Sequence, residues 1–88
     1  MVTDMRRVCE QVSSEKNVIL DIEPFIKPDT TRINLAKIPD GDELDYIAGF
    51  DFRADLLAYI SDNDLYQYLS IQIDRALDGK RVQSIRLS

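Results

Sequence analysis

One stretch, residues 51–79, constrains the fold most because it carries the longest helical apolar periodicity in the chain. At about 100° per residue, its second part gathers one apolar group within a sector about 120° wide: Leu65, Tyr66, Leu69, Ile73, Ala76 and Leu77. Such a stripe is typical of a helix that packs on a core. Ser61 and Asp62 are both suited to cap a helix, and a glycine follows at position 79. We therefore predict two helices, at about residues 52–60 and 62–78.

The N-terminal part also has helical periodicity. Its apolar residues follow the i, i+3, i+4, i+7 pattern: Met5, Val8, Cys9 and Val12. Thr3 or Asp4 can cap this helix, which we expect to end within residues 13–16. Cys9 lies on the apolar stripe, so we expect it to be packed rather than reactive.

Two segments then change from helical period to strict alternation. Within residues 17–23, Val18, Leu20 and Ile22 alternate with polar residues, which leaves Ile19 as the only apolar residue of the outer face. Pro24 is expected to end this strand. Residues 31–36 alternate in the same way, and a Pro-Asp pair at positions 28 and 29 signals a turn between the two. The pattern predicts an antiparallel hairpin with a long loop.

The remaining segments complete the predicted fold. We expect a turn at residues 39–41, a short helix at 43–48 ended by Gly49, a cap at Asp51 for the next helix, and a last strand at 82–87. The predicted order is α-β-β-α-α-β. That order indicates an α+β fold, with a small antiparallel sheet of about three strands packed against helices. With 88 residues, we expect a single globular domain over 1–88.

Composition excludes most classes of chemistry. The chain has no histidine and one cysteine, so it lacks the usual general base and cannot complete a tetrahedral zinc site. We expect no enzyme activity, catalytic residue, metal or cofactor. A membrane-spanning helix needs about 20 apolar residues, and no stretch of the sequence approaches that. A single cysteine is also unlike the disulfide frameworks of small secreted domains. We therefore expect a cytoplasmic protein with no membrane association.

Acidic residues are concentrated in residues 40–64. This acidic segment has a net charge of −7, because one arginine accompanies eight acids: Asp40, Asp42, Glu43, Asp45, Asp51, Asp55, Asp62 and Asp64. Clustered carboxylates can steer a basic protein onto a surface. Alternatively, the acids are helix caps and first-turn residues that stabilise helix N-termini. A calcium loop is disfavoured because Leu44 stands where the EF-hand pattern needs an acid.

A second candidate surface lies on the long predicted helix. Asp64, Tyr68, Ile71 and Arg75 share a sector about 240–300° from Leu65, outside the core stripe. Tyrosine and arginine are favoured at binding hot spots. Another element of the fold, such as the N-terminal helix, is the alternative explanation for this face.

These features predict a small acidic protein-binding domain, such as an inhibitor, an immunity or antitoxin-like factor, or an accessory protein of a phage or mobile element. The expected partner is a protein with a basic surface. The predicted partner-binding residues are Asp40, Asp42, Glu43, Asp45, Asp55, Asp64, Tyr68, Ile71 and Arg75. The alternative function is a homo-oligomeric structural subunit with its self-interface on the long helix. Direct binding of nucleic acid is not expected, because the basic residues are scattered and outnumbered.

Overall fold

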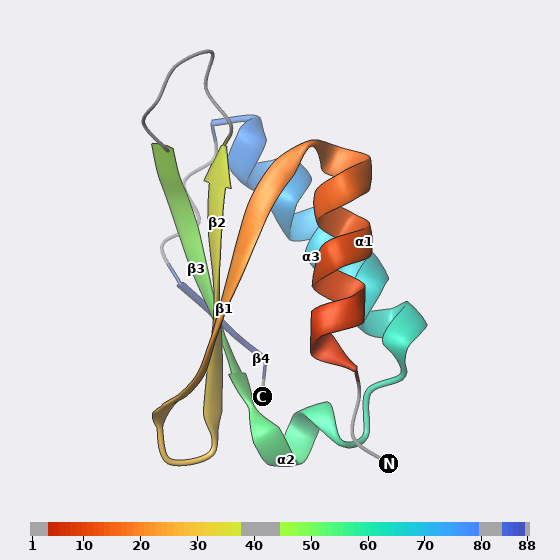
Figure 1. The fold of residues 1–88 in the computed structure, drawn as a ribbon, viewed down its shortest axis with the longest axis vertical. Helices are drawn as coiled ribbons and strands as arrows, with labels where there is room; N and C mark the ends of the chain where they lie inside the picture. Colours follow the sequence, from red (N-terminus) through yellow and green to blue (C-terminus); the bar gives the residue numbers. More distant parts are fainter. Residues whose placement is uncertain (1–3, 38–44, 80–83, 88) are drawn as a thin grey trace.

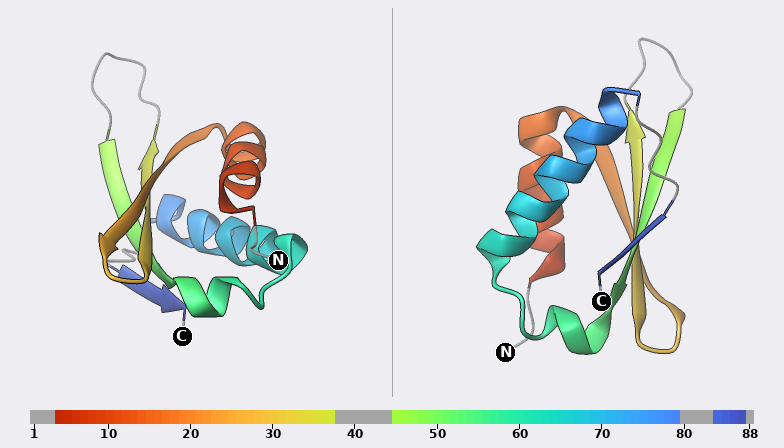
Figure 2. Two further views of the ribbon diagram at one scale, coloured as in Figure 1. Left: turned by 60° about the horizontal axis from the view of Figure 1, so that its bottom comes forward. Right: turned by 180° about the vertical axis from the view of Figure 1, so that it is seen from behind.

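Two helices cover one face of a four-stranded sheet, and no other described helix lies on the opposite face (Figure 1). The computed structural model describes residues 4–37, 45–79 and 84–87, without the side chains of residues 25, 26 and 84–87. The elements are α1 (Met5–Lys16), β1 (Val18–Lys27), β2 (Thr30–Lys37), β3 (Asp45–Arg53), α2 (Ala54–Leu57), α3 (Asp62–Leu77) and β4 (Ser84–Leu87). The sheet order is β1-β2-β3-β4, with α1 and α3 on the covered face (Figure 2).

The predicted α+β class is confirmed, and three antiparallel strands, β1 to β3, form most of the sheet. The predicted order, α-β-β-α-α-β, lacks one strand of the observed α-β-β-β-α-α-β, because strand β3 stands where a short helix was expected. The predicted last strand is present as β4, and it pairs in parallel with β3. Among the described helices, none is long and apolar enough to span a membrane.

The N-terminal helix has the predicted cap and the predicted buried stripe. The Asp4 carboxylate accepts a hydrogen bond from the backbone N–H of Arg7 at 3.2 Å, as an N-cap residue does. Val8, Cys9 and Val12 are the buried residues of α1. The helix ends in the left-handed Asn17, with φ at 54°, so a single residue separates α1 from β1.

The first hairpin is tighter and longer than predicted. Pro24 does not end β1 but pairs with Thr31 of β2, and the register shifts between Pro24 and Lys27. A proline is tolerated there because β1 pairs on one side only among the described strands, and an edge strand needs no ladder donor on its free side. Pro28 and Asp29 alone separate the strands, with Asp29 at a φ of 63°.

The segment from Asp45 to Arg53 is the main correction to the predicted fold. Of the short helix expected at residues 43–48, the described part is strand β3, and the helix expected at 52–60 is reduced to the single turn of α2. Phe50 and Phe52 explain this, since both are fully buried and only a period of two places both on one face. Asp51 is therefore not a helix cap; it lies in β3.

The long helix α3 has the predicted cap and core stripe. The Ser61 hydroxyl accepts a hydrogen bond from the N–H of Asp64, and Gly79 follows the helix with a φ of 81°. Four residues of α3 are buried, Leu65, Leu69, Ile73 and Ala76. They join one core with α1 and the inward residues of the sheet, among them Ile33, Leu35, Ala48, Phe50 and Phe52.

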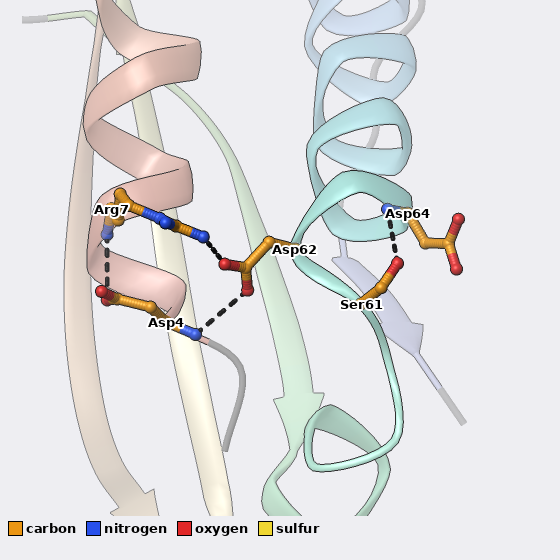
Figure 3. Close-up of polar contacts among 5 residues, drawn as sticks. All are labelled: Asp4, Arg7, Ser61, Asp62 and Asp64. Atoms are coloured by element: carbon orange, nitrogen blue, oxygen red, sulfur yellow. Dashed lines mark hydrogen bonds and ion pairs between the residues drawn. The ribbon is translucent and has the colours of Figure 1, made fainter. Parts of the chain in front are cut away.

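Ion pairs join α1 and α3 near both ends. Arg7 pairs with Asp62 at the helix starts, and the Lys16 Nζ lies 2.9 Å from Asp74 Oδ1 near the helix ends. The two helices therefore run parallel (Figure 1), which places their positive N-termini side by side. Figure 3 shows the Asp62 carboxylate between them, where it also accepts from the N–H of Asp4 at 3.2 Å. This carboxylate offsets the repulsion of the aligned helix dipoles.

Candidate protein-binding surface

The acidic segment does not form one patch among the described residues. Asp40, Asp42 and Glu43 lie outside the described residues. Asp45 begins β3, whereas Asp55 lies in α2, just beyond the other end of that strand. Nine strand residues span about 26 Å at roughly 3.3 Å per step. The structure therefore separates Asp45 from Asp55, which the sequence places close together.

Asp55 and Asp64, two acids of this segment, differ in their contacts. Asp55 is exposed, but its Oδ1 accepts from Arg53 Nε at 3.1 Å, and this bond lowers the pKa of Asp55 below its usual value. Asp64 is exposed in the first turn of α3, and Figure 3 shows its carboxylate directed away from the ion-paired Asp62. Asp64 is thus both a first-turn acid of α3 and an exposed charge, so its position fits either of the two interpretations of this residue.

The predicted second face of α3 is divided by the fold. Tyr68 is half-buried, with its ring in an edge contact to Phe52 at 6.0 Å between centroids, and burial raises the pKa of the phenol. Ile71 is 54% exposed and Arg75 is exposed. The alternative explanation therefore holds for Tyr68, although β3 rather than α1 provides this ring contact. Ile71, Arg75 and Asp64 remain on the exposed side of the helix.

More of the exposed polar and apolar side chains lie together on a different surface, the face of the sheet opposite α1 and α3. We call it the open face. Its positions alternate with the inward-facing ones along β1 and β2, whereas in β3 a register shift leaves two residues between Tyr46 and Gly49. The residues of this face are Ile19, Asp21 and Glu23 of β1, Arg32, Asn34 and Ala36 of β2, and Tyr46, Gly49 and Asp51 of β3. The strand register aligns them in three rows across the sheet, Ile19–Ala36–Tyr46, Asp21–Asn34–Gly49 and Glu23–Arg32–Asp51.

The first row gives the open face an apolar end. Ile19 is 37% exposed and Tyr46 is 63% exposed, with Ala36 between them. A hollow of about 560 Å³ lies here, and side chains from all three rows line it, including Asp21, Glu23 and Asn34. An aromatic ring beside carboxylates can receive a cationic side chain, through its π face and by charge.

The position of Tyr46 depends on Gly49. A Cβ atom placed on Gly49 would lie 2.6 Å from the Tyr46 hydroxyl, 3.7 Å from Asn34 Oδ1 and 3.8 Å from Arg32 Nε. The absent side chain therefore allows the tyrosine to lie across the strand, and it brings three polar groups around one point. Glycine in a strand interior often marks such a close approach.

The third row alternates in charge. Arg32 donates from Nε to Asp51 Oδ1 at 2.8 Å and from Nη2 to Asp51 Oδ2 at 3.2 Å, and Glu23 lies opposite on the other side. These contacts, with the Asp51 hydrogen bond foremost, raise the pKa of Arg32. Asp21 adds a third carboxylate, so the open face has a formal net charge of −2.

Sequence reasoning found only part of this surface. It assigned Ile19, Asp21 and Glu23 to an outer strand face, but it placed Tyr46 and Gly49 in and after a helix. The missed signal was the period of two shown by Phe50 and Phe52, which Gly49 obscured because glycine is disfavoured inside strands. Tyr46 reaches the open face through the register shift between Leu35 and Ala36, which the sequence does not mark.

Comparison with known proteins adds no relative, because no family model, curated protein or solved structure matches this chain. Within the ranges that the structure describes, no three acidic or cysteine side chains are grouped as ligands for a metal ion. What the open face offers chemically is recognition by shape, charge and an exposed aromatic ring.

Proposed function

We propose that this chain is a small acidic binding protein that acts in the cytoplasm by docking its open face on another protein with a basic surface. The observation that carries the proposal is the hollow between Tyr46 and the carboxylates of Asp21 and Glu23, on a sheet face that α1 and α3 leave uncovered. An inhibitor, an immunity or antitoxin-like factor, or a phage accessory protein would use such a surface, because each acts by masking a partner.

Charge and apolar contact have separate roles in this proposal. Asp21 and Glu23 are exposed and form no ion pair among the described residues, so their charge is available to steer a basic partner. Tyr46 supplies a ring of the kind that is enriched at binding hot spots. Steering acts mainly on the association rate, whereas a packed aromatic anchor acts mainly on the dissociation rate.

The test starts from the partner that the immobilised protein captures from its native cells, identified by mass spectrometry and then purified. We expect the double variant Asp21→Asn, Glu23→Gln to associate several-fold more slowly and to lose much of its salt dependence. Tyr46→Ala should instead dissociate at least tenfold faster. Both rates are measured by surface plasmon resonance at several salt concentrations.

Two further variants serve as controls. Glu15→Gln with Asp78→Asn removes two exposed acids at helix C-terminal ends, where the loss of negative charge does not weaken a helix. It should associate like the parent protein. The variant Asp45→Asn, Asp55→Asn, Asp64→Asn tests the acidic segment. If it slows association and the Asp21, Glu23 variant does not, the open face is not the docking surface.

The second candidate function, a homo-oligomeric structural subunit, is supported by Ile71, which is 54% exposed beside Arg75 on α3. One exposed isoleucine is common on monomeric proteins, so this support is weaker than the grouping on the open face. Molar mass by light scattering decides the matter, and Ile71→Lys should convert an oligomer of this kind to monomers.

A further inference from the structure

The outer edge of β1 is open to another strand. Within the described part of the sheet, β1 pairs with β2 alone, so one of its edges has no strand partner. Edge strands present rows of backbone donors and acceptors that can pair with another chain. At ten residues β1 is also long, since most strands have about five or six.

A groove of about 400 Å³ runs along this edge. Its walls are Arg6, Cys9, Glu10 and Ser13 of α1 and the five consecutive β1 residues Val18 to Ile22. The α1 residues have the spacing of one helix face. Successive strand side chains point to opposite faces of a sheet, so a groove that touches five in a row must follow the edge of β1 rather than either face. Cys9, at 2% exposed, forms part of the floor.

The charged residues that line the groove indicate which kind of strand it would bind. Glu10 and Asp21 line the groove, Arg6 is the only base among its described lining residues, and Glu23 continues the acidic side of β1. A second copy that added its own β1 in an antiparallel register centred on Ile22 would place Asp21 and Glu23 opposite each other's carboxylates. Like charges facing each other across strands are destabilising. The groove therefore favours a foreign strand with lysine or arginine at alternate positions.

We propose that the groove between α1 and β1 binds an extended basic segment of another protein, which adds as a fifth strand beside β1. Alternate lysine or arginine side chains meet Asp21 and Glu23 on the open face, and the small apolar residues between them face α1. This rests on the proposed function and deepens it, because Ile19, Leu20 and Asp21 line both the groove and the hollow of the open face.

The probe is a seven-residue peptide with alternating lysine and valine, acetylated and amidated at its ends, titrated into isotope-labelled protein at low salt. Alternate N–H groups of a strand point to the same edge. Methylation of three valine nitrogens therefore blocks one edge, and methylation of three lysine nitrogens blocks the other, at equal charge. We expect one isomer to bind within about threefold of the parent peptide and the other at least tenfold more weakly. Alternate amides from Val18 to Glu23 should become protected from exchange.

A pair of protein variants tests the groove itself. Ser13 is half-buried and lines the groove, whereas the neighbouring Ser14 is exposed and does not. Ser13→Tyr should weaken binding of the parent peptide at least tenfold, and Ser14→Tyr should leave it within about twofold, with circular dichroism unchanged in both.

Equal binding of the two methylated isomers, with no protection of amides from Val18 to Glu23, would overturn strand addition, since simple attraction between charges neither distinguishes one backbone edge from the other nor protects these amides. It would leave the open face as the acidic docking surface. Failure of the parent peptide to bind would also overturn strand addition, and the kinetics of the captured partner would then decide the proposed function separately.

Discussion

The two faces of one sheet have different tasks. On the covered face, Ile33, Leu35, Phe50 and Phe52 are fully buried under the helices. On the open face the same strands present Ile19, Tyr46 and the exposed carboxylates of Asp21 and Glu23. The two sets alternate along β1 and β2, and along β3 from Ala48 onward. Positions that stabilise the fold and positions that are exposed for recognition are therefore interleaved. Substitutions at neighbouring positions should therefore differ sharply in effect.

The largest contrast is expected between two aromatic residues of β3. Phe50→Ala should lower the free energy of unfolding by about 3 to 5 kcal/mol, since it removes a fully buried ring from the core. Tyr46→Ala, four residues earlier, should stay within about 0.5 kcal/mol because the ring is mostly exposed. Urea unfolding followed by circular dichroism measures both. Comparable losses would mean that the open face also supports the fold.

A smaller effect is expected at Cys9, on the covered side. Burial, with a lesser effect of Glu10, raises the pKa of this thiol from 9.0 to about 12. The folded protein thus favours the protonated thiol, so its contribution to stability is complete below pH 9 and is lost as the pH rises from 9 towards 12. Cys9→Ala should reduce this alkaline loss, at a cost of about 1 to 2 kcal/mol at neutral pH. Fast labelling of native Cys9 by a thiol reagent at pH 7 would contradict this assignment.

The smallest effect concerns Gly49 on the open face. A methyl group there meets only the end of the exposed Tyr46 side chain closely, and that end can move aside. In a Tyr46→Ala background, Gly49→Ala should stabilise the protein by about 0.5 to 1 kcal/mol, since alanine loses less conformational freedom on folding. In the parent protein the gain should be smaller. A double-mutant cycle in urea gives the difference as a coupling energy, and a coupling of zero would show that the two positions are independent.

The sequence was sufficient for the elements whose local signals agree. In α1 and α3, caps, apolar stripes and terminal residues all indicate helix. In β1 the alternation is uninterrupted up to Pro24, and in β2 it continues through residues 31–36. The signals conflict in β3, where Asp45 and Ala48 fit a helix, Gly49 suggests its end, and only Phe50 and Phe52 show the period of two. This segment is a strand because both rings are buried in the tertiary structure. Intrinsic residue propensities do not include that burial.

The candidate site was harder to predict for the same reason. Charge counts along the chain grouped Asp45, Asp55 and Asp64, but the strand between the first two separates them by its full length. The open face instead combines residues from three strands, from Ile19 to Asp51. Only the register of the sheet brings them together, and the shift in that register between Leu35 and Ala36 cannot be read from the alternation along a single strand.

The parallel pairing of α1 with α3 has a consequence for how the chain acquires its structure. The contacts of Asp4 and Lys16 with α3 join residues 58 positions apart, so the first helix obtains this support only after nearly the whole chain is available. Contacts between distant residues slow folding because a large loop must close first. During synthesis, α1 therefore forms these contacts only after α3 has emerged from the ribosome. We expect the two helices to pack together in one late folding step.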